Sequence, residues 1–187
     1  MKRIASVILT GALILSMGAA AFAATPSKTV ADEIKAVAAV ETTGFDRVSI
    51  STEETEATVA QSAKVVAELA SSTEELKEAV GATAEEKVEI TAVQTVTIEQ
   101  TPLFNRTEAT VSLSSAVIDA AYKENEQVTV LVMVPVVGKD GTVTYEKIAV
   151  TGVVKDGKVQ VKLTGALLKK IGKKSVTLVA TKKTAKV

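Results

Sequence analysis

Apolar and polar residues follow a helical spacing up to about residue 86 and a two-residue alternation after it. A first helix is predicted by a capping pair and apolar residues three or four positions apart: Thr29, Asp32, Val30, Ile34 and Val37. The polar stretch 42–44 ends this helix. Val48 and Ile50 then alternate with polar neighbours, which predicts a short strand.

A longer helix is predicted next, because Ser51 and Glu54 have the spacing of a capping box. Its apolar face is expected to carry four residues at helical spacing: Val59, Ala63, Val66 and Ala70. Ser72 and Glu75 repeat the capping spacing before a short helix, and Gly81 ends that helix.

Strands and turns are predicted from Lys87 onward, where the period becomes two residues. The nearly continuous apolar run 128–137 is typical of a strand buried on both faces, with a bulge or an edge near Pro135. Glycine-containing turns are predicted at 138–141 and 155–157. Between these turns the apolar positions change parity from 143 and 145 to 148 and 150, which predicts a bulge near 146–147.

A weak internal repeat lies within this strand-rich half. Residues 111–118 followed by 128–130 resemble residues 161–168 followed by 176–178, and both copies have the pattern of strand, helical turn and strand. Two copies are too few for a solenoid. Paired Greek-key-like halves of one fold and chance similarity among valine-rich strands both remain open.

These patterns predict an α+β protein in which a helical N-terminal segment precedes an antiparallel β-sandwich of immunoglobulin-like or Greek-key type. The expected division is a signal peptide over 1–23, a mainly helical region over 24–86 and the β-sandwich domain over 87–187. Lys2 and Arg3, the apolar run 4–17 and the small residues around 21–23 are typical of an export signal. We therefore expect a secreted protein, or one held at the cell surface without a covalent anchor, that does not span the membrane after cleavage.

The catalytic inventory is narrow, because the chain has neither histidine nor cysteine. Zinc and thiol enzymes and histidine-dependent triads are thereby disfavoured, and no phosphate-binding glycine motif follows a strand. Aromatic residues make up 3% of the chain, which disfavours stacking surfaces for sugars or nucleic acid. We expect no enzyme activity, no cofactor, no metal site and no nucleic-acid partner.

Charge is distributed unevenly although the net charge is zero. Residues 24–100 hold 15 acids and 6 bases, whereas residues 101–187 hold 7 acids and 14 bases. The lysines toward the C-terminus form the candidate anion-binding site: Lys169, Lys170, Lys173, Lys174, Lys182, Lys183 and Lys186. A solvated lysine face balanced by the acidic half is the alternative interpretation.

The leader ending at Ala21-Phe22-Ala23-Ala24, the stretch 73–81, Val88-Glu89-Ile90 and the strand 128–132 resemble small secreted β-module proteins of clostridial and related Gram-positive bacteria. This resemblance implies a surface or accessory domain without catalytic residues. The leading hypothesis is an exported, non-enzymatic binding or accessory protein whose partner is an anionic cell-envelope polymer or another extracellular protein. The alternatives are a carboxylate-dependent hydrolase of polysaccharide or peptidoglycan and an assembly subunit that pairs through a sheet edge.

Overall fold

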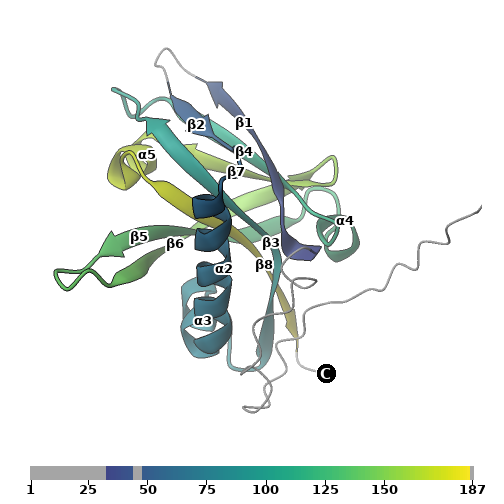
Figure 1. Ribbon diagram of the computed structural model, residues 1–187. Coiled ribbons are helices and arrows are strands. Elements are labelled where there is room, and N and C mark those ends of the chain that lie inside the picture. The colour runs from purple at the N-terminus through teal and green to yellow at the C-terminus, as the bar shows by residue number, and fades with distance from the viewer. Residues whose placement is uncertain (1–32, 44–47, 186–187) are drawn as a thin grey trace, which may run out of the picture.

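The computed structural model describes residues 33–43 and 48–185, and its eight strands form a single sheet (Figure 1). The strand order is β1-β4-β7-β6-β5-β8-β3-β2, and all neighbours are antiparallel. The strands are β1 (Val37–Thr43), β2 (Ser49–Ser51), β3 (Glu86–Gln100), β4 (Glu108–Ser114), β5 (Gln127–Val137), β6 (Val143–Lys155), β7 (Lys158–Thr164) and β8 (Ser175–Ala185). The helices are α2 (Glu56–Ser71), α3 (Thr73–Val80), α4 (Ile118–Ala121) and α5 (Gly165–Ile171).

The sheet curls until its two ends nearly meet. Lys35, just before β1, forms a parallel bridge with Val93 of β3, and the amide of Ala36 donates a 2.9 Å hydrogen bond to the carbonyl of Val93. The result is a nearly closed, barrel-like sheet. The prediction of a β-rich antiparallel fold with a few helices is confirmed, while a sandwich of immunoglobulin-like or Greek-key type is not.

The first predicted helix is wrong where the structure describes it. Only Glu33 and Ile34 are helical, and Val37–Thr43 is strand β1. Every residue of β1 pairs with β4, from Val37 opposite Ser114 to Thr43 opposite Glu108. Pairing with a distant strand therefore overrides the local helical spacing, and the region 24–86 contributes two strands to the sheet as well as helices.

The interior of the barrel is filled by alternate residues of the long strands. Most buried side chains of this core are Val, Leu, Ile and Ala, with Leu113, Leu163 and Leu178 among the largest fully buried ones. The inward positions Val159, Val161 and Leu163 of β7 confirm the predicted alternation. Gln94, which shares the parity of Ala92 and Val96 on β3, is a buried polar exception.

Helices α2 and α3 cover the outer face of the sheet over β3, β5 and β8 and form a second core there. In Figure 1 they lie in front of these strands. The buried side chains of the helices are Thr58, Val65, Leu69, Leu76 and Val80. None of the described helices combines the length and the apolar character needed to cross a membrane.

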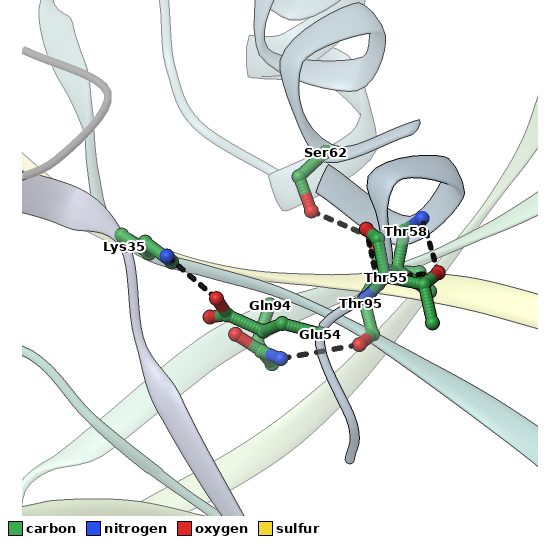
Figure 2. Close-up of polar contacts among 7 residues, drawn as sticks. All are labelled: Lys35, Glu54, Thr55, Thr58, Ser62, Gln94 and Thr95. Atoms are coloured by element: carbon green, nitrogen blue, oxygen red, sulfur yellow. Dashed lines mark hydrogen bonds and ion pairs between the residues drawn. The ribbon is translucent and has the colours of Figure 1, made fainter. Parts of the chain in front are cut away.

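Two details of α2 differ from the prediction. Its cap is Thr55, whose hydroxyl accepts from the amide of Thr58 while the Thr58 hydroxyl accepts from the amide of Thr55 (Figure 2). Ser51, the predicted cap, is instead the last residue of β2, where it pairs with Thr97 of β3. The face toward the sheet carries Val65 and Leu69, whereas the predicted face begins at the exposed Val59. The short helix α3 and its end at Gly81, which has φ 64°, are confirmed.

A row of hydroxyl and amide groups joins α2 to the sheet. Ser62 of α2 and Thr95 of β3 share a 2.7 Å hydrogen bond, and Thr95 shares a 2.8 Å bond with Thr177 of β8 (Figure 2 shows the first). The amide of Gln61 donates to the Thr177 hydroxyl and to the Ser175 carbonyl. The second core is therefore apolar under one end of the helices and polar near the N-terminus of α2.

The β5–β6 hairpin is regular from end to end. Its register runs without a shift from Gln127 opposite Val153 to Val137 opposite Val143, so the predicted bulge near 146–147 is wrong. Apolar residues lie on both faces of β6 because Tyr145 packs on the core under the helices and Ile148 and Val150 pack on the barrel interior. Pro135 lies beyond Met133, where pairing with β8 ends, so the predicted edge is found without a bulge.

The internal repeat corresponds to equivalent elements. β4, α4 and β5 repeat as β7, α5 and β8. β4 pairs antiparallel with its counterpart β7, and β5 pairs antiparallel with its counterpart β8. Antiparallel pairing of equivalent strands is the arrangement that an approximate two-fold axis produces, so the repeat is structural and forms most of the barrel.

Candidate anion-binding surface

The structure divides the predicted lysine site between the two ends of β8. Lys169 and Lys170 lie in the last turn of α5, and Lys173 and Lys174 lie in the turn that leads into β8. Lys182 and Lys183 lie near the far end of the strand, about 25 Å away at the usual rise per strand residue. Lys186 lies outside the described residues.

Three segments contact α5 or the turn that follows it. A Cβ added at Gly165, the first residue of α5, would lie 2.8 Å from the carbonyl oxygen of Phe104, so α5 begins against the β3–β4 loop. The amide of Ile98, near the end of β3, donates to the carbonyl of Lys174. The Lys174 ammonium donates a 3.4 Å bond to the carbonyl of Pro135 in the β5–β6 hairpin.

We call this surface the basic end. It comprises the loop 101–107, helix α5, the turn 172–174 and the hairpin segment 135–146, which all lie at the left of Figure 1. Its basic residues are Arg106, Lys139, Lys169, Lys170, Lys173 and Lys174, all of them exposed. Lys170 forms a 2.6 Å ion pair with Glu146 of β6, which fixes α5 against the hairpin.

Lys182 and Lys183 have local structural contacts instead. The Lys182 ammonium lies 5.1 Å from the centre of the Tyr122 ring, at the distance of a cation–π contact. Lys183 donates 3.5 Å bonds to the carbonyls of Val80 and Gly81, at the C-terminus of α3. A cation is favourable there because the last carbonyls of a helix carry partial negative charge.

Two carboxylates converge on Lys147 of β6. Its ammonium lies 3.0 Å from Glu75 of α3 and 3.4 Å from Glu68 of α2. Burial lowers the pKa of Lys147, but its bonds to Glu75 and Glu68 raise that pKa by more in total, so the net shift is upward. This arrangement ties both helices to the hairpin, and it differs from the open pair of carboxyls that a glycoside hydrolase places on either side of a sugar.

Two carboxyl groups with displaced pKa values accept hydrogen bonds from nearby threonines, Glu86 at the start of β3 and Asp140 in the turn of the β5–β6 hairpin. The backbone and side-chain bonds that Glu86 accepts from Thr83 lower the pKa of Glu86. The side-chain and backbone bonds from Thr142 lower the pKa of Asp140, which fits the predicted turn there. Within residues 33–43 and 48–185, no group of three or more acidic side chains is arranged to hold a metal ion.

Leu103 and Phe104, two large apolar side chains exposed in the loop of the basic end, are candidate binding residues that were not predicted from the sequence. The sequence does contain a signal for them: two adjacent apolar residues follow a proline and precede Asn105 and Arg106. A segment of this kind lacks the apolar–polar alternation of a strand, so its apolar side chains are not expected to be buried in the sheet. No family model, curated protein or solved structure matches this chain.

Proposed function

We propose that this is an exported, non-enzymatic binding or accessory protein that holds an anionic polymer of the cell envelope. The observation that carries the proposal is the basic end, where the loop 101–107, which contains Arg106, packs on the start of α5, and the exposed Lys169 and Lys173 follow in α5 and the turn 172–174. Export rests on the leader pattern in residues 1–23.

The chemistry of this surface favours a repeating anion over a single small ligand. Lysine is a compact, strongly hydrated charge that binds phosphate or carboxylate without demanding a fixed geometry. Five of the six basic residues of the basic end are lysines. Arg106 is the sixth, and arginine is the residue whose guanidinium can bind one phosphate through two parallel hydrogen bonds. Binding of this kind depends on counterion release, so its affinity falls steeply with salt.

The test uses inorganic polyphosphate as the probe and compares two double variants of equal charge. K169Q/K173Q changes the basic end, and K155Q/K158Q changes the β6–β7 turn at the opposite end of β6. We expect K169Q/K173Q to weaken binding and to reduce the slope of log affinity against log salt by roughly 1.5, since each phosphate contact contributes about 0.7 to 0.9. Equal losses in both variants would show that only net charge matters and would contradict the proposal.

A second candidate, assembly through a sheet edge, is favoured by one specific observation. Within the described residues, β6 pairs with β7 only from Gly152 to Lys155, while Val143–Thr151 pairs with β5 alone. Such an edge offers backbone groups to a strand of another molecule. Light scattering that gives the monomer mass at high concentration would contradict this candidate.

A further inference from the structure

Exposed apolar side chains gather at the basic end. Among the described residues, five of the seven large apolar side chains that remain exposed lie there: Leu103, Phe104, Val136, Val137 and Val143. The other two are Val37 at the start of β1 and Val59 on α2. Scattered apolar residues are normal on a protein surface, but most of these share one end with the exposed lysines.

Leu103 and Phe104 are the most prominent of the five. They are 78% and 65% exposed, they are adjacent in the chain, and they lie in a loop that packs on the start of α5. A Cβ added at Gly165 would lie 2.8 to 2.9 Å from the carbonyl oxygens of Phe104, Asn105 and Thr107, so the loop backbone is closely packed on the first residue of α5. Strand β3, which leads into the loop, bonds the turn 172–174 through Ile98 and Lys174. A loop fixed in this way loses little conformational entropy when its side chains are buried by a partner.

A soluble polyanion explains the lysines but gives no role to the apolar pair. The surface of a bilayer with anionic lipids has both properties, since it attracts basic residues and accepts Leu and Phe side chains at the boundary between headgroups and acyl chains. Each basic residue near such a surface contributes by attraction, and each immersed apolar side chain contributes by the hydrophobic effect. The charge and the apolar residues of the basic end therefore match one occupant.

We propose that the basic end docks on a bilayer that contains anionic lipids, with Leu103 and Phe104 immersed at the level of the headgroups and Arg106, Lys169 and Lys173 against the lipid phosphates. This inference rests on the anion binding of the proposed function and adds an anionic bilayer as a further partner of the same surface. The molecule lies on the membrane and does not cross it.

A fluorescence experiment tests the immersion directly, because the chain contains no tryptophan. F104W places a single reporter in the loop and keeps it apolar, and V37W places one at an exposed apolar position near the other end of the barrel. With vesicles of phosphatidylglycerol and phosphatidylcholine, we expect a blue shift for F104W and none for V37W. A F104W spectrum unchanged by these vesicles would overturn the proposal.

Vesicle sedimentation separates this inference from the proposed function. We expect L103S/F104S to bind the same vesicles about tenfold more weakly or worse, because half-immersion of two such side chains has that effect. It should bind polyphosphate like the unchanged protein, and V37S/V59S should bind vesicles normally. If L103S/F104S keeps full vesicle affinity while K169Q/K173Q loses it, immersion is wrong and anion binding stands. If the unchanged protein binds neither vesicles nor polyphosphate, both proposals are wrong.

Discussion

The two cores of this molecule lie on opposite faces of the same strands and are held together differently. The barrel interior is almost wholly apolar, with side chains from strands far apart in the sequence, such as Val96, Val161 and Leu178. The core under α2 and α3 combines apolar contacts around Leu69 with the hydroxyl row of Ser62 and Thr95. One sheet therefore has one face that packs on itself and one face that depends on a covering layer.

This difference has a consequence for stability. Loss of packing inside the barrel affects strands that are hydrogen-bonded to one another around the sheet, so opening is expected to involve the whole fold. Loss of packing under the helices affects a layer attached by side chains alone, which can open before the sheet does. The covering layer is also held by the contacts of Lys147 with Glu68 and Glu75.

The largest expected effect comes from truncation of one leucine in each core. Leu178→Ala and Leu69→Ala both empty fully buried positions, and each is expected to lower the free energy of unfolding by about 2 to 5 kcal/mol. In hydrogen exchange, Leu178→Ala should accelerate strands and helices together, whereas Leu69→Ala should accelerate mainly the amides of α2 and α3. Uniform acceleration in both variants would show that the two cores unfold as one unit.

The next effect concerns the hydroxyl row. Thr95→Val removes the central group and leaves Ser62 and Thr177 each without one bond, which is expected to cost about 1 to 2 kcal/mol in denaturant unfolding. T95V/T177V should lower the free energy of unfolding by less than the sum of the two single changes, because removing both hydroxyls leaves neither of them without the other as a partner.

Thr97→Val is the matched control for this prediction. Thr97 lies two residues along β3 and shares a 2.8 Å bond with Ser175, but it is only partly buried, so water can replace its bond. Its cost is expected to stay below about 0.5 kcal/mol. If Thr95→Val costs no more than Thr97→Val, the hydroxyl row does not hold the helices to the sheet.

The same two faces explain how much of the fold was predictable. Strands β3, β5 and β7, the turns beside β6 and the short helix α3 were predicted because each has a local period or a turn residue. Strand β1 was mistaken for a helix because its register depends on β4, some seventy residues away. A bulge was predicted in β6 because its apolar residues change parity, which would need a bulge if the strand faced a single core. The strand instead contacts one core on each face, so apolar residues of both parities are accommodated without a bulge.

The candidate site was predictable only in part. Four lysines close in sequence are also close in space because α5 and its turn are local structures. Lys182 and Lys183 were grouped with them by sequence distance alone, but an extended strand separates them from the others. Leu103 and Phe104 were missed because exposure of a loop residue depends on what packs over it, and no periodicity in the sequence encodes that.

Apart from the control variant Thr97→Val, the smallest effect at neutral pH is expected at the polar end of the barrel interior. Tyr122 shares a 2.8 Å hydrogen bond with Thr91, and the Thr91 hydroxyl also donates to the carbonyl of Ala180. Tyr122→Phe removes only the hydroxyl group. Thr91 keeps its hydrogen bond to the carbonyl of Ala180, and the ring stays under Lys182. The expected loss in free energy of unfolding is therefore below about 1 kcal/mol at pH 7.

At alkaline pH the same variant should instead be protected. Burial, opposed by the bond to Thr91, raises the pKa of Tyr122 well above its ordinary value of 10.0, so the fold requires the neutral phenol. In the unfolded chain the tyrosine hydroxyl ionises near pH 10. The contribution of the neutral Tyr122 hydroxyl to the free energy of unfolding is therefore complete below this pH and falls as the pH rises above it. As the pH rises above 10, the difference in free energy of unfolding that favours the unchanged protein over Tyr122→Phe should become smaller and then change sign. Burial also raises the pKa of Tyr145, so Tyr145→Phe is the control, and an equal protection in both variants would mean that the buried position of Tyr122 is not the cause.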